Sequence, residues 1–309
     1  MFRIYRVWIS LGLMCGVVAH PSTLFAAEQP VPVPAEFSHD PGGLPAGQAG
    51  GSGEASSSHS HEQFDALLKS HVKDGRVDYP AFLKDRVQLD AYIASLGTAS
   101  PSGYEAWDES TKITFWINAY NAITLKVILD HYPIKRSGSP LGLAFPANSI
   151  RQIPGQWDKI THVVMGRPMT LNGIEHETLR KKFREPRIHM ALVCAAKGCP
   201  PLRSEAYEGK RLSQQLDDQA RIYLSSPVGF KLDKEGKTVA LSSIFLWFGD
   251  DFLKAYGDPQ EPRELTDKKR AVVAFASRYV SPDAQAFFKK GGYRLSFLGY
   301  DWSLNEKES

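Results

Sequence analysis

The sequence contains few cysteines, no long hydrophobic run and no excess of charge of one sign. Only three of its 309 residues are cysteine, which is too few for a small disulfide-rich scaffold. Its 37 basic residues nearly balance 34 acidic ones, whereas a general nucleic-acid binder shows a clear basic excess. With 42% hydrophobic and 23% charged residues, the composition is that of a globular protein with a large core. The composition therefore favours a protein or small-molecule partner over a nucleic acid.

The sequence also lacks the motifs of the common catalytic and nucleotide-binding classes. It has no Walker loop, no GxGxxG, no HExxH, no GxSxG and no RNA-binding aromatic motif. No cofactor and no metal are predicted. Any prediction of function must therefore rest on individual residues and their surroundings.

Residues 1–27 have the order of a secretory signal peptide. Arg3 and Arg6 precede an almost continuously apolar stretch over residues 7–18, and Ala27 is one of the small residues that suit cleavage. The apolar stretch is shorter than the about 20 residues that span a bilayer. We expect cleavage near Ala27, no stable membrane span afterwards, and an extracytoplasmic location, which is the periplasm if the source is a Gram-negative bacterium. An uncleaved N-terminal anchor is the alternative.

Residues 28–60 are predicted to form a disordered linker, because they are rich in Pro, Gly and Ser and poor in apolar residues. His59 and His61 are expected to belong to this solvated tail rather than to a metal site. One folded domain, residues 61–309, follows. Its helical segments alternate with short hairpin patterns rather than with regular βαβ units. This order favours an α+β fold, a helix-rich single domain with an antiparallel sheet.

Sequence signals mark several elements of this domain. The first helix is expected to end at a left-handed cap at Gly75. The longest helix begins after Asp108 or Ser110 and reaches about His131, where Pro133 helps to stop it. It is apolar on nearly every side, which predicts a buried helix. The other expected elements are helices over about 173–183, 209–225 and from Ser242 or Ser243, hairpins over 160–171 and 230–241, and a buried strand over 187–193.

Two asparagines interrupt the long apolar helix. Asn118 and Asn121 lie three residues apart and therefore share one face. A buried amide without a partner costs about 1–3 kcal/mol, so both need hydrogen-bond partners. They are expected to bond the backbone of a neighbouring loop, and the alternative is a polar wall of a pocket.

The segment LNGIEHETLR contains two further polar candidates. Asn172 and Glu175 have the spacing of a helix-capping pair. His176 shares a helix face with Leu179, so it can be a hydrogen-bonded core histidine. These structural roles are favoured, and an acid/base role for Glu175 or His176 is the alternative.

The segment PRIHMALVCAAKGCPPLR contains Cys194 and Cys199, which would be the only cysteines of the mature chain. They can close a local disulfide, supply a nucleophilic thiolate, join His189 or His176 on a metal, or stay reduced. An oxidising compartment favours the disulfide. The four-residue gap is wider than a CxxC half-site, which disfavours the metal. In a regular strand His189 and Cys194 would lie on opposite faces.

Six stretches together resemble the family catalogued as domain of unknown function 547. They are VDYPAFLKD, FWINAYNAITL, MTLNGIEHETLR, PRIHMALVCAAKGCPPLR, LSSIFLWFGDDF and YDWSLN, and they cover about residues 62–305. The resemblance implies an exported bacterial protein of about this size, but it implies no settled activity. The last stretch, around Asp301, is expected to anchor the chain end.

Two classes of function remain open. The first is an extracytoplasmic binding or interaction module that a Cys194–Cys199 disulfide staples. The second is an exported hydrolase or acyl-transfer enzyme, in which a histidine activates a thiolate and an amide donates to the developing oxyanion. Its site would gather Cys194 or Cys199 with His189, Glu175, His176 and Asn118. A stable disulfide favours the module, and a reactive thiol favours the enzyme.

Overall fold

The computed structural model describes residues 58–257, 259–260 and 262–308, which belong to one compact unit, residues 49–309. The predicted signal peptide and most of the predicted linker lie outside the described residues. The α-helices are α1 Glu62–His71, α2 Tyr79–Phe82, α3 Arg86–Thr98, α4 Pro101–Ala106, α5 Glu109–His131, α6 Pro140–Leu143, α7 Arg180–Lys182, α8 Leu212–Leu224, α9 Ser243–Trp247, α10 Gly249–Tyr256, α11 Asp267–Ala276 and α12 Pro282–Lys290. Short 3₁₀ helices cover Leu83–Asp85, Ile150–Gln152, Pro186–Met190 and Gly209–Arg211, and a π-helix covers Gly173–Leu179.

The predicted α+β class is confirmed, because helices dominate and the strands form small sheets. The strands are β1 Val72–Lys73, β2 Arg76–Val77, β3 His162–Val164, β4 Arg167–Met169, β5 Phe230–Asp233, β6 Thr238–Ser242 and β7 Arg294–Leu298. The pairs β1–β2, β3–β4 and β5–β6 are antiparallel. Strand β7 adds to β6 in parallel, since the chain returns to this sheet only after four helices.

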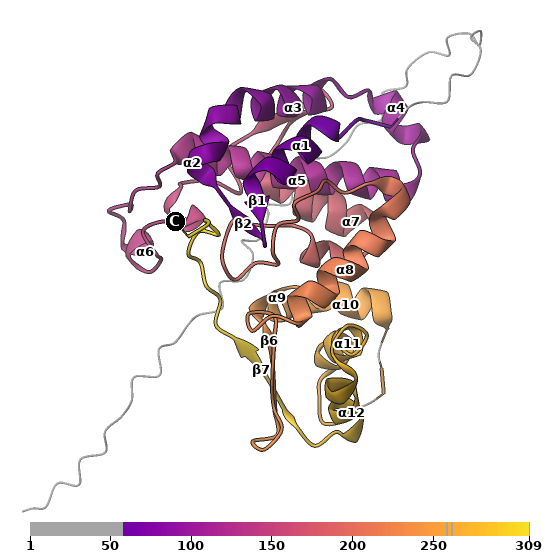
Figure 1. Ribbon diagram of the computed structural model, residues 1–309. Helices are drawn as coiled ribbons and strands as arrows, with labels where there is room; N and C mark the ends of the chain where they lie inside the picture. The colour runs from indigo at the N-terminus through magenta and orange to yellow at the C-terminus, as the bar shows by residue number, and fades with distance from the viewer. Residues whose placement is uncertain (1–57, 258, 261, 309) are drawn as a thin grey trace, which may run out of the picture. The chain divides into compact units, whose positions relative to one another are not determined.

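Helix α5 is the centre of the larger group of helices (Figure 1). Its N-terminus is capped by Asp108, whose carboxylate accepts a hydrogen bond from the Thr111 N–H at 2.7 Å. It packs against α3, α8 and the π-helix. Nearly all of its residues from Ile113 to Leu129 are buried, as its all-round apolar pattern predicts.

The buried residues form two hydrophobic clusters, and α8 contributes to both. Leu216 belongs to the first cluster, which is built mainly from α1, α3 and α5. Tyr223 belongs to the second, which is built mainly from the elements between β6 and β7. Figure 1 shows α8 running between the two groups of elements. Helix α8 therefore lies where the two clusters meet.

The structure corrects two expectations near the N-terminus. Helix α1 ends at His71, and Gly75 occupies the left-handed turn of the β1–β2 hairpin, with φ +77°. His59 is not part of a solvated tail, because its ring lies 5.5 Å from the ring of Phe115. His61 donates to or accepts from the Tyr92 hydroxyl at 2.7 Å. Ordered packing therefore begins before the predicted boundary.

The predicted strand over residues 187–193 is wrong. Residues Pro186–Met190 form a 3₁₀ helix, and an irregular buried segment follows. The apolar run is buried among helices, and none of the described strands lies beside it to form a ladder. The physical reason for its burial is tertiary packing, which the local pattern does not distinguish from a sheet.

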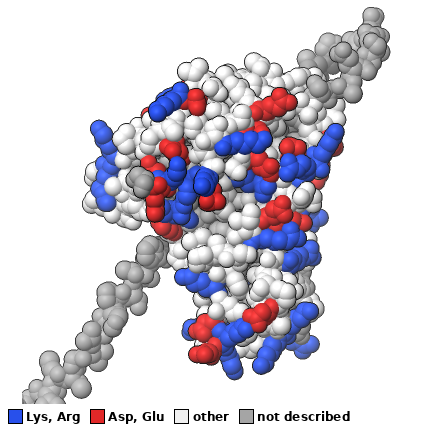
Figure 2. All heavy atoms as spheres, in the orientation of Figure 1, with Lys and Arg blue, Asp and Glu red and all other residues white. Residues whose placement is uncertain are grey.

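The described surface mixes both signs of charge. Figure 2 shows Lys and Arg interspersed with Asp and Glu on one face, rather than gathered in a broad patch of one sign. Among the described helices, none is both long and apolar enough to cross a membrane.

Candidate functional site

Cys194 and Cys199 lie at the two ends of a tight loop, with their Sγ atoms 2.6 Å apart. The structure has no covalent bond between them. The Tyr300 hydroxyl lies 3.2 Å from the sulfur of Cys194 and donates to that of Cys199 at 3.0 Å. Burial opposes ionisation of Cys199, but hydrogen bonds from Cys194, Tyr300 and the backbone outweigh it and lower its pKa. The predicted proximity of the cysteines is confirmed, and their oxidation stays a prediction.

The loop between the cysteines is held against the C-terminal segment. The Gly198 N–H donates to the Asp301 carbonyl at 2.8 Å, and the Lys197 N–H donates to the Ser303 carbonyl at 2.7 Å. A Cβ atom on Gly198 would lie 2.8 Å from the backbone nitrogen of Asp301, so the close approach requires glycine. The Asp301 carboxylate accepts from the Ser303 N–H at 2.9 Å. The expected anchoring of the chain end is confirmed.

The two candidate histidines gather around an acid that sequence reasoning did not single out. His189 lies 2.9 Å from the Asp251 carboxylate and stacks on Phe248 at 4.0 Å. Arg180 donates to Asp251 at 2.5 Å and to the Nδ1 atom of His176 at 2.9 Å. Burial alone would raise the pKa of Asp251, but hydrogen bonds from His189 and Arg180 hold it well below its usual range. Burial lowers the pKa of His176.

The structure thus divides the predicted residues into two groups. Cys194 and Cys199 contact Tyr300, whereas His176 and His189 belong to the Asp251 group. In the part of the chain that the structure describes, no hydrogen bond joins a histidine to either sulfur. The same part contains no group of three or more His, Cys, Asp or Glu side chains placed to hold a metal ion.

Glu175 has a different role from the predicted one. Asn172 makes no side-chain cap, and the Thr170 hydroxyl accepts the N-terminal N–H of the π-helix at 3.0 Å. Glu175 is buried on the inner side of that helix. Burial chiefly, with the nearby Glu175 charge, raises the pKa of Tyr120 well above its ordinary value. The hydrogen bond with Cys199 and burial chiefly, with a smaller contribution from the Glu175 charge, raise the pKa of Cys194 well above its ordinary value.

Asn118 and Asn121 each clamp a loop to α5. The Asn118 amide donates to the Tyr207 carbonyl at 2.9 Å and accepts from the Tyr207 N–H at 3.0 Å. The Asn121 amide donates to the Ala191 carbonyl at 3.0 Å and accepts from the Val193 N–H at 3.0 Å. The expected bonding to loop backbone is confirmed for both residues. Asn118 is thus a structural clamp rather than an oxyanion donor in this conformation.

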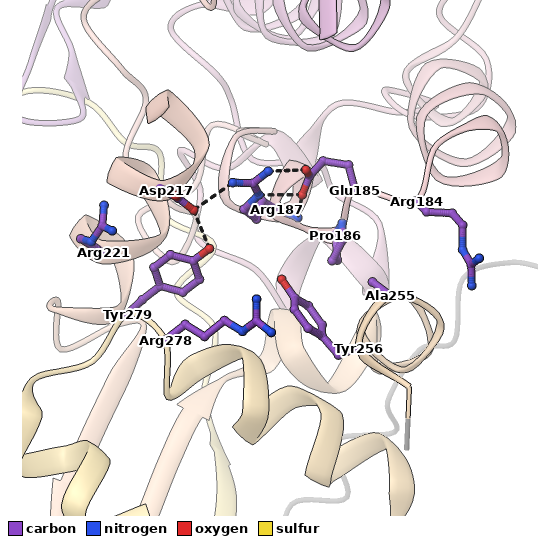
Figure 3. A pocket seen from close by; sticks show the side chains of 10 residues that line it. All are labelled: Arg184, Glu185, Pro186, Arg187, Asp217, Arg221, Ala255, Tyr256, Arg278 and Tyr279. Carbon is purple, nitrogen blue, oxygen red and sulfur yellow. Dashed lines mark hydrogen bonds and ion pairs between the residues drawn. The ribbon is translucent and has the colours of Figure 1, made fainter. Parts of the chain in front are cut away.

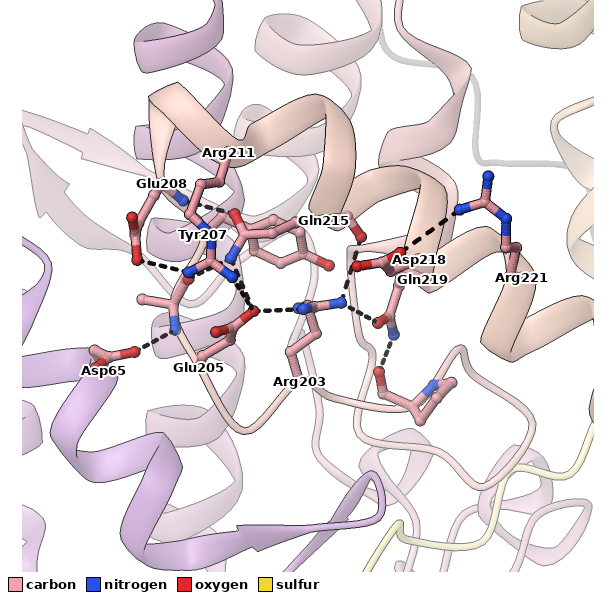
Figure 4. Close-up of polar contacts among 12 residues, drawn as sticks. Asp65, Arg203, Glu205, Tyr207, Glu208, Arg211, Gln215, Asp218, Gln219 and Arg221 are labelled. Carbon is pink, nitrogen blue, oxygen red and sulfur yellow. Dashed lines mark hydrogen bonds and ion pairs between the residues drawn. The ribbon is translucent and has the colours of Figure 1, made fainter. Parts of the chain in front are cut away.

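The segment that follows Cys199 is fixed to α8 (Figure 4). Gln215 is fully buried, and its amide donates to the Ala206 carbonyl at 2.9 Å while accepting from the Glu208 N–H at 2.8 Å. The Arg203 guanidinium donates to Gln219 at 3.4 Å. These hydrogen bonds fix the conformation of the segment that follows Cys199.

A hollow of about 450 Å³ opens between the 186–190 turn, α8, α10 and the residues after α11 (Figure 3). On one side Arg187 donates to Glu185 at 2.8 Å and to Asp217 at 2.9 Å. The Tyr279 hydroxyl donates to the same Asp217 carboxylate at 2.6 Å. Both acids of the hollow are therefore already bonded to neighbours within it.

The other side of the hollow carries donors without partners. The Arg278 guanidinium lies 4.6 Å from the centre of the Tyr256 ring. Within the described chain neither this guanidinium nor the Tyr256 hydroxyl makes a hydrogen bond or an ion pair. Figure 3 shows both groups turned into the hollow and Arg184 turned away from it. Sequence reasoning missed this site, because its residues come from separate elements and form no motif.

Residues 104–224 match the family model described as "Protein of unknown function, DUF547". No curated protein and no solved structure matches the chain. The matched part contains all six predicted site residues, whereas Asp251, Tyr256, Arg278 and Tyr300 lie beyond it. Over residues 104–224, the chain resembles the DUF547 family.

Proposed function

We propose that this protein is an exported binding module, stapled by a Cys194–Cys199 disulfide, whose ligand is a small organic anion held beside Arg278. The observation that carries the proposal is the guanidinium of Arg278, which faces the 450 Å³ hollow without an acidic partner. Arginine is the side chain best suited to carboxylate and phosphate groups, because its planar donors match two oxygens at once.

The charge of the hollow favours an anion. Apart from Arg184, which is turned away, three arginines line it against two acids, and both acids are bonded within the hollow. A cationic ligand would have to compete with Arg187 for Glu185 and Asp217. An anion can accept from Arg278 and from the Tyr256 hydroxyl without breaking any contact. The free donors therefore select a carboxylate or a phosphate group.

The size and walls of the hollow favour a compact organic molecule. Ligand sites in proteins enclose about 300–1,000 Å³, and this hollow lies within that range. The rings of Tyr256 and Tyr279 line it and offer flat apolar contact next to the charged groups. A ring or short chain that bears one carboxylate or phosphate suits this combination.

Export and oxidation belong to the same proposal. The signal-like order of residues 1–27 supports export, and the short distance between the Cys194 and Cys199 sulfurs supports a disulfide. A disulfide needs the two sulfurs at about 2.05 Å, which a small movement from 2.6 Å provides. Intact-mass measurement of the exported protein tests both points. It should show cleavage near Ala27 and a mass lower than that of the dithiol by two hydrogen atoms.

Ligand binding is tested by isothermal titration of the exported protein with benzoate and with inorganic phosphate. Benzamide is the neutral analogue of benzoate and should not bind. Arg278→Gln should weaken anion binding by about tenfold or more, since a hydrogen bond to a charged group contributes about 1.5–3 kcal/mol. Arg294→Gln is the matched control, because Arg294 is an exposed arginine of β7 outside the hollow.

Two outcomes would contradict the anion site. The first is the absence of saturable binding by either anion, and the second is equal affinity in Arg278→Gln and the native protein. Binding of benzamide as tight as that of benzoate would show that ring contact, not charge, selects the ligand. Intact-mass measurement tests the Cys194–Cys199 disulfide separately, so the two parts of the proposal can fail independently.

A further inference from the structure

The two cysteine residues differ in their exposure to solvent. Cys194 is half-buried, whereas Cys199 is only 4% exposed. Cys194 is therefore the cysteine that an external thiol reaches more easily. In thiol–disulfide exchange the attacked sulfur must be reachable, and the other sulfur must leave as a thiolate.

The surroundings of Cys199 suit a leaving thiolate. Its sulfur accepts from the Tyr300 hydroxyl at 3.0 Å and from the Cys194 backbone N–H at 3.1 Å. The Tyr300 ring is held in place by Trp302 at 4.7 Å and Trp247 at 4.9 Å. These donors surround the sulfur of Cys199 while the pair is unbonded, so a negative charge on this sulfur finds its partners in position.

The shape of the loop does not depend on a bond between the sulfurs. Backbone hydrogen bonds from Lys197 to Ser303 and from Gly198 to Asp301 hold the loop against the C-terminal segment. The structure itself keeps the sulfurs adjacent while they are unbonded. Opening of a disulfide would therefore leave both cysteines near their bonded positions, ready to close again.

We propose that the Cys194–Cys199 disulfide is exchangeable and that its substrate is a dithiol reductant, with Cys194 the attacked sulfur and Cys199 the leaving group. This inference rests on the disulfide of the proposed function. A thiolate of the dithiol attacks Cys194, the bond between the two cysteines breaks, and Cys199 leaves as a thiolate beside Tyr300. The second thiol of the reductant then attacks the reductant sulfur that is bonded to Cys194 in the mixed disulfide. The reductant closes to a disulfide, and Cys194 leaves as a thiolate.

The exchange balances in atoms and electrons. The protein disulfide gains two electrons and becomes two thiols, while the dithiol loses two electrons and becomes a disulfide. The two protons of the reductant end on the two cysteines. The reverse direction oxidises the pair again with any disulfide of the same class.

Single-cysteine variants test which sulfur is attacked. Full-length Cys199→Ser retains the half-buried thiol, and Cys194→Ser retains the buried one. Both folded variants are treated with dipyridyl disulfide. Cys199→Ser should form a mixed disulfide at least about tenfold faster than Cys194→Ser. Equal rates, or a faster reaction of Cys199, would overturn the assignment.

A second comparison tests the role of Tyr300 as a positioning residue. Tyr300→Phe should slow reduction of the disulfide by dithiothreitol about threefold or more, since a leaving thiolate of higher pKa departs more slowly. Tyr293→Phe is the matched control, because the buried Tyr293 hydroxyl has no hydrogen-bond partner in the structure. Thermal midpoints of the oxidised variants separate this effect from a change in stability.

The result separates this inference from the proposed function. If mass shows the disulfide but dithiothreitol reduces it no faster than the protein unfolds, the staple stands and the exchange is refuted. An unchanged rate in Tyr300→Phe would refute the role of Tyr300. Two free thiols that resist oxidised glutathione would refute both the staple and the exchange, while anion binding is measured independently.

Discussion

Replacing Asn121 by leucine should destabilise the protein strongly, although the two side chains are similar in size. Asn121 lies on the buried helix α5, where its amide pairs with the carbonyl of Ala191 and the N–H of Val193. Leucine can make neither bond. Both backbone groups would then stay buried without a partner, because none of the strands that the structure describes lies beside this segment to replace the amide.

The expected loss follows from these two groups. Each buried polar group left without a partner costs about 1–3 kcal/mol. The added apolar surface of leucine recovers up to about 1 kcal/mol. The net change in the free energy of unfolding is therefore about 1–6 kcal/mol, a large part of the about 5–15 kcal/mol that a native protein possesses.

Urea titration followed by circular dichroism measures this change. The matched control is Thr114→Val on the same helix, because the buried Thr114 hydroxyl has no hydrogen-bond partner. Its removal should change the free energy of unfolding by less than about 1 kcal/mol. If Asn121→Leu and Thr114→Val have the same midpoint at an unchanged slope, the clamp does not contribute to stability and the reasoning is refuted.

Three other perturbations can be checked with the same methods. Gly198→Ala should lower the thermal midpoint by several degrees, because the new Cβ would lie 2.8 Å from the backbone of the C-terminal segment. Gly138→Ala is the control, because a Cβ at that position meets nothing within 4 Å. The low pKa of Asp251 contributes stability above about pH 4 that is lost as the pH falls, so Asp251→Asn should show a flatter loss of stability between about pH 5 and 3 in urea titrations. A chain that begins at Glu62 should melt below the full chain at pH 7.5. Burial and the charge of a neighbouring histidine lower the pKa of His61 to about 3, so the unfolded state takes up the proton first and this difference should shrink as the pH falls below about 6.5.

Local signals were sufficient for most of the helices and hairpins. Asp108 and Pro133 mark the two ends of α5. A helix closes its hydrogen bonds within its own segment, so the residues that cap or stop it are its neighbours in the sequence. The inward asparagines were predictable on the same ground. An amide on an apolar helix must find a partner, although the sequence does not say which loop supplies it.

The failed strand over residues 187–193 shows where local reasoning stops. A run of apolar residues has the same pattern in a buried strand and in a buried irregular segment. The difference lies in what pairs its backbone. Here the Asn121 side chain takes the place of a neighbouring strand for two of its backbone groups, and this residue lies 72 positions from Val193. The wrong strand prediction and the confirmed prediction for Asn121 therefore concern the same backbone groups, which the Asn121 amide binds.

The candidate sites owe their chemistry to residues that the fold brings in from beyond residue 224. Tyr300 reaches the sulfur of Cys199 across 101 residues, and Asp251 reaches His189 across 62. Both cysteines and His189 lie in the part that matches the family model, whereas their partners do not. A chain with an intact 104–224 region but another residue in place of Tyr300 would keep the pair of sulfurs and lose the hydroxyl between them. The reactivity of the cysteines is therefore a property of the whole folded unit, and variants of Tyr300 test it more directly than variants within the matched region.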